Sequence, residues 1–423
     1  MAYGQRLESL ESLESLESLE SLESLESLES LESLESLESL LSLIISLQEK
    51  PTMTEKLNRN TYLSKHVGDF PEKADILGRE FVKVDDLRYG TNPHQTAAFY
   101  KPVGRDCVIG DMQVLKNGKS GLSQTNLEDI SFSLNIVKFF DIPACACMKH
   151  VNPCGAACAV PGDTLKDVYI KARDCDARAA FGSVIAFNVK VDADTAREIM
   201  TTFVECVVAP DFEPEAVAIF SDPEAKLNKH VRILKCGDLK KLPKYVGDDI
   251  SGYQTFKVLA DGCLVIADPL MTNIHSVADL KPAEADSKTL GHVVSTVKAT
   301  PAQLQDILMA WYVNISVRSN GVVIVKNGGT LCVGTGEQDR VGAVEQAIVK
   351  FNDKYGGKET IKDAVMASDG FFPFPDGVEV AAKAGVTAII APSGSLKDAD
   401  VIQRANELGV ALFHAPERVF SHH

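Results

Sequence analysis

The fold of this chain is decided by the stretch Ile142-Pro143-Ala144-Cys145-Ala146-Cys147-Met148-Lys149-His150-Val151-Asn152-Pro153-Cys154-Gly155. An apolar run of strand length delivers two adjacent titratable groups, Lys149 and His150, to a point where Asn-Pro and Gly are expected to end regular structure. A strand that stops at such a pair is typical of α/β enzymes, which present catalytic groups at the carboxyl edge of a sheet. The alternative is a Lys and a His at a solvated strand end.

From about residue 81 onward, apolar runs of strand length alternate with amphipathic stretches of helical period. The expected strands lie at 81–84, 142–148, 184–187, 322–325, 387–390 and 410–413, and the expected helices at 127–140, 165–174, 301–313, 341–350 and 398–408. This alternation predicts an α/β fold with open sheets flanked by helices. We expect a first subdomain over 81–222, a less regular connecting region over 223–284 and a second subdomain over 285–423.

The amino-terminal part has a different character. Residues 7–40 repeat Leu-Glu-Ser, and a three-residue period makes the Leu stripe wind around a helix instead of forming one face. A coiled coil requires a period of 3.5. Residues 1–50 are therefore interpreted as a low-complexity tail or a gene-model artefact in preference to an oligomerisation helix, and the polar segment 51–80 as a linker.

Composition narrows the class of protein. With 423 residues, 45% hydrophobic and 24% charged, the chain has room for two or three ordinary soluble domains. Glutamates of the repeat, from Glu8 to Glu38, supply eleven of the sixteen net negative charges, so the remainder carries about −5. A mildly acidic body argues against a nucleic-acid partner, and no window approaches the ~18 apolar residues of a membrane span. The ten cysteines, mostly in apolar runs and without a secretory signal, predict reduced thiols and a cytoplasmic protein.

Five clusters combine polarity with turn residues: Leu87–Gln95, Lys149-His150, Ala180–Ser183, Arg318–Gly321 leading into Gly334–Arg340, and Ser368–Asp376 followed by Ala391–Ser395. Arg88-Tyr89-Gly90 suits a phosphate. Three phenylalanines around a proline, bracketed by Asp369 and Asp376, suit a flat heteroaromatic ligand. The Gly-x-Gly of the fourth cluster is neither a dinucleotide fingerprint nor a nucleotide P-loop.

A zinc site is a competing interpretation of Pro153–Cys158. The segment is close to the Pro-Cys-x-x-Cys half of zinc deaminases, but three residues separate the cysteines and no His-x-Glu stands upstream. His150, Cys154 and Cys158 would line one face if the segment were helical. We predict no metal site.

Taken together and in this order, the five clusters and Ala209–Phe212 resemble the 5-aminoimidazole-4-carboxamide ribonucleotide (AICAR) formyltransferase family, the carboxy-terminal part of the bifunctional purine biosynthesis protein. The resemblance runs from about residue 85 to the end, and the family's cyclohydrolase domain is expected to be absent. It implies a duplicated cytidine-deaminase-like α/β/α fold without the deaminase zinc. It also implies a homodimer with active sites at the subunit interface, and leaves open a bound potassium ion (K+).

The implied activity is formyl transfer from 10-formyltetrahydrofolate to the 5-amino group of AICAR. That amine is a poor nucleophile, so catalysis has to withdraw its proton, stabilise the tetrahedral oxyanion and protonate the departing folate nitrogen. By resemblance, His150 assists removal of the amine proton, Lys149 supports protonation of the leaving group, and Asn320 orients the formyl group.

The resemblance also assigns binding positions. Arg88, Tyr89 and Arg418 match positions that hold the nucleotide phosphate, although both arginines are open to an alternative as surface ion-pair residues. The remaining nucleotide positions are Asn126, Gly182, Glu205, Arg340 and Phe371, and the folate positions are Phe374, Asp376 and Arg178. Phe371 and Phe374 have an alternative role in core packing.

Three positions depart from the family pattern, and two of them, Ile315 and Arg178, support a rival function. Ile315 stands where many members have Lys, Arg178 where smaller or apolar residues are usual, and Glu337-Gln338-Asp339 replaces the commoner Gln-x-Ser. The rival is a regulatory homologue that binds AICAR without turnover. The sequence also leaves open a formate-dependent donor.

Overall fold

The computed structural model describes residues 61–118 and 120–422. These residues form one compact unit. The Leu-Glu-Ser tail and the first ten residues of the predicted linker lie outside the described residues.

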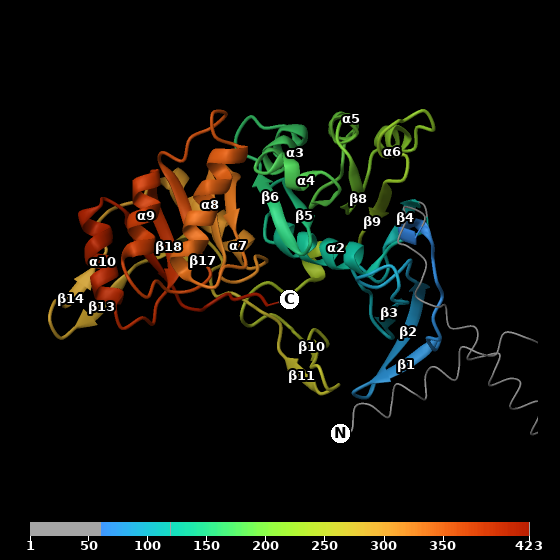
Figure 1. The fold of residues 1–423 in the computed structure, drawn as a ribbon, viewed down its shortest axis with the longest axis horizontal. Helices are drawn as coiled ribbons and strands as arrows, with labels where there is room; N and C mark the ends of the chain where they lie inside the picture. Colours follow the sequence, from blue (N-terminus) through green and yellow to red (C-terminus); the bar gives the residue numbers. More distant parts are fainter. Residues whose placement is uncertain (1–60, 119, 423) are drawn as a thin grey trace, which may run out of the picture. The chain divides into compact units, whose positions relative to one another are not determined.

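One mixed sheet of twelve strands organises this unit (Figure 1). Its order is β12-β19-β18-β17-β15-β16-β6-β5-β7-β8-β9-β4. The strands are β4 (Gln113–Lys116), β5 (Ala144–Lys149), β6 (Asn152–Cys158), β7 (Ser183–Phe187), β8 (Val204–Ala209), β9 (Arg232–Lys235), β12 (Lys281–Pro282), β15 (Val322–Lys326), β16 (Gly329–Gly334), β17 (Ala364–Ser368), β18 (Val386–Pro392) and β19 (Ala411–Ala415).

The two halves of the sheet have the same order and strand directions. In the first, β5 and β6 form an antiparallel hairpin, β7 is antiparallel to β5, and β8 and β9 continue in parallel. In the second, β15 and β16 form the hairpin, β17 is antiparallel to β15, and β18 and β19 continue in parallel. The halves meet where Ala157 of β6 pairs with Gly329 of β16, so one continuous sheet replaces the separate sheets that were expected.

Helices cover both faces of this sheet. Residues of α2 and α7 share one apolar core, while α3, α5 and α6 pack in a second core and α8, α9 and α10 in a third. The helices are α2 (Gln124–Val137), α3 (Leu165–Asp174), α4 (Ala177–Ala180), α5 (Ala193–Ile199), α6 (Pro214–Phe220), α7 (Pro301–Asn314), α8 (Arg340–Lys354), α9 (Asp376–Ala384) and α10 (Asp398–Glu407). The predicted α/β fold is confirmed, and each predicted helix and strand overlaps an observed one.

The packing of β5 between two apolar cores explains why the sequence of this strand is apolar from Ala144 to Met148. Ala144, Ala146 and Met148 belong to the core with α2, whereas Cys145 and Cys147 belong to the core with α3. Successive side chains of a strand point to opposite faces, so a strand covered on both faces is a continuous apolar run. All ten cysteines are free thiols, and eight of them are buried.

The expectation that Asn-Pro ends regular structure after His150 is wrong. Asn152 begins β6, which contains Pro153 and Cys154, so the cysteines lie on a strand and not on a helical face. Pro153 is tolerated because the β5–β6 register shifts beside it, at Met148, and a proline at a bulge removes no regular ladder bond.

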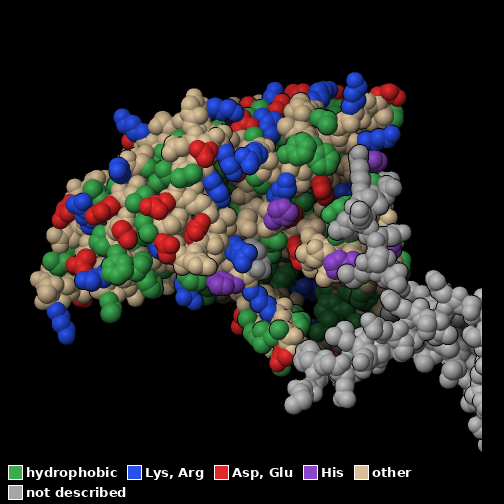
Figure 2. All heavy atoms as spheres, viewed as in Figure 1, with side chains coloured by type: hydrophobic (Ala, Val, Ile, Leu, Met, Phe, Trp, Pro, Cys, Tyr) green, Lys and Arg blue, Asp and Glu red, His purple; other side chains and the backbone are tan. Residues whose placement is uncertain are grey.

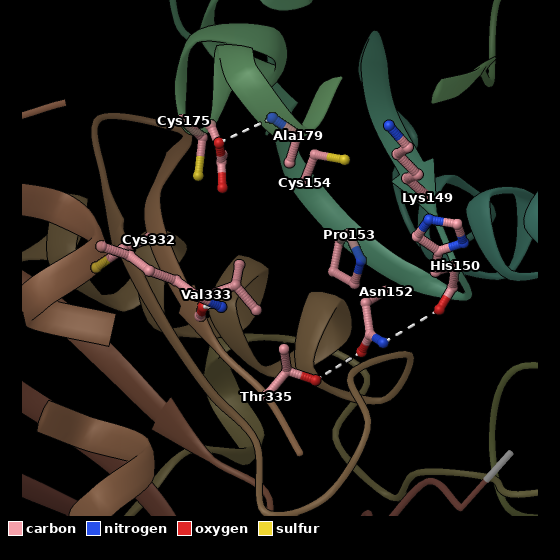
Figure 3. A pocket seen from close by; sticks show the side chains of 12 residues that line it. Lys149, His150, Asn152, Pro153, Cys154, Cys175, Ala179, Cys332, Val333 and Thr335 are labelled. Atoms are coloured by element: carbon pink, nitrogen blue, oxygen red, sulfur yellow. Dashed lines mark hydrogen bonds between the residues drawn. The ribbon is translucent and has the colours of Figure 1, made fainter. Parts of the chain in front are cut away.

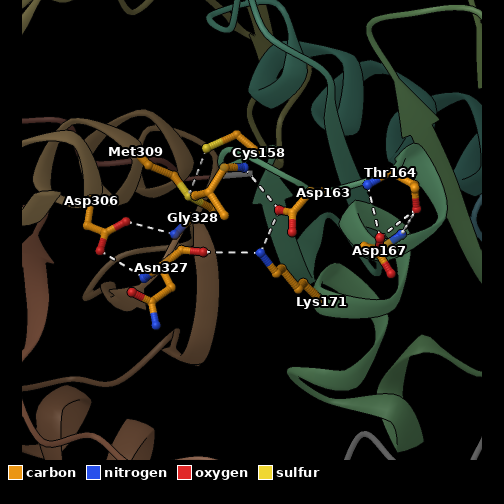
Figure 4. A network of polar contacts seen from close by, with 10 residues as sticks. Cys158, Asp163, Thr164, Asp167, Lys171, Asp306, Met309, Asn327 and Gly328 are labelled. Atoms are coloured by element: carbon orange, nitrogen blue, oxygen red, sulfur yellow. Dashed lines mark hydrogen bonds and ion pairs between the residues drawn. The ribbon is translucent and has the colours of Figure 1, made fainter.

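The β15–β16 turn is fastened to the first half by polar contacts (Figure 4). The Asp306 carboxylate on α7 accepts the backbone N–H groups of Asn327 and Gly328, both at 2.8 Å. Lys171 on α3 donates to Asp163 at 2.6 Å and to the Asn327 carbonyl at 3.4 Å. Asp306 thus holds the turn against α7 of its own half, and Lys171 joins the turn to α3 of the first half.

Smaller sheets lie outside the main one. A three-stranded sheet contains β1 (Lys73–Ile76), β2 (Arg79–Asp86) and β3 (Ala98–Pro102), and β1 falls within the segment expected to be irregular. Two hairpins pair β10 (Thr255–Val258) with β11 (Leu264–Ala267), and β13 (Glu284–Ser287) with β14 (Gly291–Val294). Across residues 61–118 and 120–422, every helix is too short or too polar to cross a membrane.

Candidate active site

The Lys149–His150 pair lies at the tip of the β5–β6 hairpin. Lys149 pairs with Asn152, which leaves His150 and Val151 as a two-residue turn. Their φ angles are +55° and +59°, as a type I′ turn requires at both central positions. Asn-Gly is the usual choice there, and a β-branched residue with positive φ is a true outlier. Residues held in such conformations cost about 1–3 kcal/mol and cluster at functional sites.

Three elements hold this turn in place. The Asp129 carboxylate on α2 accepts the Val151 N–H at 2.7 Å. The Asn152 side chain donates to the His150 carbonyl at 3.2 Å, and its Oδ1 accepts the Arg318 N–H at 3.0 Å and the Thr335 hydroxyl at 2.7 Å. The tip is therefore anchored to both halves of the molecule.

Asp129 is a site residue that lies in none of the five sequence clusters. Burial raises its pKa to about 6, against the lowering effect of the Val151 N–H and the neighbouring His150. It lies on the buried stripe of α2 with Asn126 and Ser133. The sequence does contain a signal for this residue, because Asn126, Asp129 and Ser133 are polar residues that recur at helical spacing among the apolar residues of α2.

Lys149 projects to the opposite side of the tip from Asp129. Its Nζ donates to the Phe181 carbonyl at 2.6 Å. The following residue, Gly182, has φ +79°, and a Cβ there would lie 3.8 Å from Lys149 Nζ and 3.4 Å from the Phe203 ring. These distances are ordinary van der Waals contacts, so the positive φ, and not a lack of space, favours glycine at this position.

A small cavity of about 140 Å³ opens beside the pair (Figure 3). Its lining includes Lys149, His150, Asn152 and Thr335, and three thiols at its far end, Cys154, Cys175 and Cys332. Burial raises the pKa of Cys175 to about 12 and raises those of Cys154 and Cys332 as well, so all three thiols stay protonated near neutrality. These thiols are therefore poor nucleophiles. The other titratable side chains that line the cavity are Lys149, His150, Asp176 and Lys350, and burial lowers the pKa of Lys350.

Four predicted ligands form an arginine cluster in the first half. Buried Arg88 donates from Nη2 to the Tyr89 hydroxyl at 3.2 Å and to Asn126 Oδ1 at 3.4 Å. Asn126 in turn donates to Glu205 at 2.8 Å. Because Asn126 and Asp129 are one turn apart on α2, this cluster adjoins the hairpin tip.

Arg232 is a fifth member, which the sequence did not single out. Its Nη1 lies 3.9 Å from Glu205 Oε2. The burial of Arg88 lowers the pKa of the Arg88 guanidinium, and the nearby charge of Arg232 lowers it further. Glu205 is partly exposed, pairs with Arg232, and is linked to Arg88 through Asn126. Arg88 Nε is buried without a hydrogen-bond partner in the described part of the chain. A cluster with this excess of donors and positive charge suits an anion such as phosphate.

Asn320 belongs to a second cluster, built in the other half of the sheet. Its side-chain and backbone N–H groups donate to the Glu337 carbonyl at 3.0 and 3.1 Å, and its Oδ1 accepts from Arg340 Nη2 at 2.6 Å. The other end of Arg340 forms an ion pair with fully buried Asp369. Arg340 is predicted as a substrate ligand. In this structure its guanidinium forms an ion pair with Asp369 and donates a hydrogen bond to Asn320.

The carboxy-terminal segment covers this second cluster. The Ser319 N–H donates to the Ser421 carbonyl at 3.0 Å, and the Arg418 guanidinium lies 4.2 Å from the centre of the Phe420 ring. The Arg340 guanidinium lies 5.8 Å from the same ring. Among residues 61–118 and 120–422, no contact joins Arg418 to Arg88, so the two predicted phosphate ligands occupy different clusters.

The aromatic loop borders the second cluster too. A Cβ on Gly370 would lie 2.7 Å from Arg340 Nη2 and 2.6 Å from the Phe420 ring, so a larger residue there would displace one of these side chains. Phe371 and Phe374 are 39% and 57% exposed, whereas Phe372 is buried and packs in the core. Asp376 is exposed at the start of α9, where it accepts the Gly377 N–H at 2.8 Å. Two of the three phenylalanines are thus available to a ligand.

The three departures from the family pattern have different structural meanings. Ile315 is buried at the end of α7 and packs in the core. Asp339 accepts the Gly342 N–H at 2.7 Å and caps α8. Arg178 is exposed on α4, one residue before the cavity-lining Ala179.

The fold and these contacts define an α/β protein with a Lys–His pair at a hairpin tip, an arginine cluster in one half and a buried Asn–Arg–Asp cluster in the other. The chain belongs to the AICARFT/IMPCHase bienzyme family, whose family model matches residues 54–350. It is 38% identical to the bifunctional purine biosynthesis protein PurH of Acetivibrio thermocellus, over 85% of this chain and 63% of that protein. It is 39% identical to PurH of Gloeothece citriformis, over 83% of this chain and 60% of that protein.

The chain thus spans less than two thirds of the length of these two curated relatives. Among solved structures, the apo dCMP deaminase of cyanophage S-TIM5 matches 27% of this chain and 98% of its own, at 23% identity and a TM-score of 0.20. A score of that size does not define a shared fold.

Proposed function

We propose that this protein is an AICAR formyltransferase of purine biosynthesis, which uses 10-formyltetrahydrofolate as the formyl donor. The observation that carries the proposal is the anchoring of the His150–Val151 turn. It is bonded to Asp129 on α2, the helix that also carries Asn126 of the arginine cluster, and through Asn152 to Arg318, two residues before Asn320. Family membership supports the same activity.

In the proposed reaction the 5-amino nitrogen of AICAR attacks the formyl carbon of the folate. His150 takes the amine proton as the new C–N bond forms, and the buried Asp129 carboxylate beside it favours the resulting imidazolium. The bond between the formyl carbon and the folate nitrogen then breaks, and Lys149 supplies the proton to that nitrogen. Asn320, held by Arg340, steadies the formyl oxygen as it gains charge.

The arginine cluster is proposed to bind the nucleotide phosphate through Arg88 and Tyr89, with Asn126, Glu205 and Gly182 near the base. Phe371, Phe374, Asp376 and Arg178 are proposed to border the folate. Arg418, another proposed phosphate ligand, lies in the other cluster of the same chain. A homodimer, in which one copy's Arg88 cluster meets the partner's carboxy-terminal segment, would bring the two together.

The proposal also includes a duplicated fold, a bound potassium ion and a location in the cytoplasm. The repeated order of strands in the two halves supports a duplicated cytidine-deaminase-like fold. A potassium ion would suit the buried oxygens of Asn314 and Ser319, which have no hydrogen-bond partner among the described residues. We further propose a cytoplasmic location, without nucleic-acid or membrane partners.

A turnover assay tests the activity. Purified protein incubated with AICAR and 10-formyltetrahydrofolate should form formyl-AICAR, followed by chromatography, and formate with ATP in place of the folate should not. Calorimetric titration with AICAR runs beside it. Binding without turnover by folded protein would overturn the enzyme in favour of the regulatory homologue.

A further inference from the structure

A second cavity, of about 650 Å³, opens at the end of the β5–β6 hairpin away from the His150 tip. Pro143, just before β5, and Cys158, the last residue of β6, both line it. Each of them is seven positions from the tip, which along a strand is roughly 20 Å. The cavity is therefore separate from the Lys149–His150 site, and its volume is in the range of small-molecule sites.

The wall of this cavity comes from both halves of the sheet. Phe139 follows α2 in the first half, whereas Asp306, Met309 and Tyr312 lie on α7 in the second. The Cys158 thiol contacts the Met309 sulfur at 3.6 Å, across the seam between the halves (Figure 4). A ligand in the cavity thus contacts both halves at once.

The two helices that line the cavity lead to the proposed active site. Asn126 and Asp129 lie on α2, and the chain that leaves α7 passes through Ser316 to Asn320. Asn135 on α2 donates to the Ser316 hydroxyl at 2.9 Å, so the two elements are bonded to each other. The cavity therefore adjoins the same two elements that carry the proposed site, at a distance from its reacting groups.

Aromatic rings form one side of the cavity. Phe139 stacks on Tyr312, with 4.4 Å between the ring centres and 13° between the planes. Tyr245 stacks on His275 at 4.1 Å and 16°. The rings of Phe139 and Tyr245 meet edge to face at 5.9 Å, so the two stacks form one assembly. The Tyr312 hydroxyl donates to the Ile274 carbonyl at 3.0 Å and fixes its ring. Such an assembly offers a preformed surface to a flat aromatic ligand.

The charges of the lining disfavour an anion. Among the described residues that line the cavity, Asp141 and Asp306 are acidic and none is Lys or Arg. Lys138, next to Phe139, is buried and donates to the Pro243 carbonyl at 2.6 Å. On the face shown in Figure 2, positive and negative side chains are interspersed, so the charges of the lining decide the local preference. Ligands with phosphate or carboxylate groups, such as nucleotides and folates, are therefore repelled.

The polar groups of the lining favour a ligand that donates hydrogen bonds. Asp141 is exposed and lies near the hydroxyl groups of Tyr245 and Tyr312. Burial raises the pKa of both hydroxyls, and the negative charge of Asp141 raises it further, so both stay protonated near neutrality. An ionised carboxylate only accepts hydrogen bonds. A matching ligand combines a flat ring with an amino group that donates to Asp141.

We infer that this cavity binds an uncharged, flat nitrogen heterocycle that carries an amino group, such as a free purine base or nucleoside. The ring stacks on the aromatic side of the cavity, and the amino group donates to the Asp141 carboxylate. The inference goes beyond the proposed function and depends on no step of the formyl transfer.

Fluorescence titration with 2-aminopurine riboside tests the site, because stacking on aromatic rings quenches this probe. Excess AICAR is present, so that the proposed active site is filled. Tyr245→Leu should raise the dissociation constant of the riboside about fivefold or more, the effect of removing one stacking partner from a base. Tyr253→Leu, at another partly exposed tyrosine outside the cavity, is the matched control and should bind as the unmodified protein does.

A second pair of variants tests the role of the Asp141 carboxylate. Asp141→Lys should raise the dissociation constant about tenfold or more, because the amino group loses its charged acceptor. Asp353→Lys makes the same change of charge at an exposed position of α8 outside the cavity and should leave binding unchanged. Circular dichroism and thermal melting check that all four variants are folded.

Hydrogen exchange of the unmodified protein keeps the test independent of variant folding. The riboside should slow amide exchange in residues 301–312 of α7. Titration without saturable quenching, equal binding by Tyr245→Leu and Tyr253→Leu, or slowed exchange at 149–152 in place of α7 would each overturn the site. Formyl transfer is assayed separately: turnover without riboside binding refutes the site and not the activity, and riboside binding at the cavity without turnover refutes the activity and not the site.

Discussion

The Asp129 carboxylate accepts the backbone N–H of Val151 at 2.7 Å, across the tip of the β5–β6 hairpin from Lys149. One buried acid on α2 thus holds a turn whose two residues both have positive φ, and it lies beside the imidazole that we propose as the base. The bond explains how an unfavourable turn persists at the position where chemistry needs it.

The first prediction concerns the proposed roles of Lys149 and His150 in turnover. His150→Ala and Lys149→Ala should each lower turnover by about 100-fold or more, because a positioned acid or base contributes roughly that much. Both side chains are at least partly exposed at the hairpin tip, so the melting temperature should stay close to that of the unmodified protein. Lys240→Ala, at an exposed lysine outside both clusters, is the control. Unchanged rates in either pair variant would remove the proposed roles.

The buried carboxyl group of Asp129 is expected to lower the stability of the folded protein at neutral pH while it supports turnover. Its pKa is raised in the folded protein to about 6, so the folded state binds this proton more tightly than the unfolded state. Stability from this group is therefore full below pH 3.8 and is lost as the pH rises through about 6, by up to roughly 3 kcal/mol.

Asp129→Asn removes that titration and can still accept the Val151 N–H. Urea denaturation at pH 4 and pH 7 should show a smaller loss of stability toward pH 7 than in the unmodified protein. Turnover should fall about tenfold or more, with a changed pH–rate profile, because the imidazolium loses its carboxylate. A variant with unaltered activity and pH–rate profile would reduce Asp129 to a purely structural role.

The Arg340–Asp369 ion pair should be costly to break from one side. Asp369→Ala leaves a buried guanidinium without its carboxylate, and the expected loss is about 3–5 kcal/mol in chemical denaturation. Arg340→Met combined with Asp369→Leu removes both charges and should lose less. The double variant should nevertheless be slow in turnover, because Asn320 Oδ1 has lost its donor. If the double variant were as unstable as Asp369→Ala, the pair would not be the cause.

Arg88 is expected to act on phosphate binding and not on chemistry. Arg88→Gln should raise the KM for AICAR at least tenfold with a small change in kcat, because loss of a charge-assisted contact costs about 1.5–3 kcal/mol. The sharp control is the phosphate-free riboside of AICAR. Calorimetry should find that the unmodified protein and the variant bind the riboside equally weakly; a variant equally impaired toward the riboside would place Arg88 elsewhere than at the phosphate.

Much of the fold followed from local pattern. The run Ala144–Met148 is apolar at both odd and even positions, which predicts a strand covered on both faces. The N-cap residues Ser123, Thr164 and Thr300 directly precede the helices α2, α3 and α7. The same local logic misjudged Asn152-Pro153, because a strand that starts at a hairpin tip and absorbs a proline at a bulge leaves no periodic signal.

The sequence by itself determined the α/β class, the adjacency of Lys149 and His150, and the motifs that place the chain in its family. These depend on covalent neighbours and on periods of a few residues. Only the tertiary structure decided that Asp129 accepts the Val151 N–H and that the charge of Arg232 lies near Arg88. It also decided that Arg340 forms an ion pair with Asp369 and donates a hydrogen bond to Asn320. The partners of each pair are separated by 20 to 144 positions, and such contacts arise when the sheet brings distant segments together, which no local period encodes.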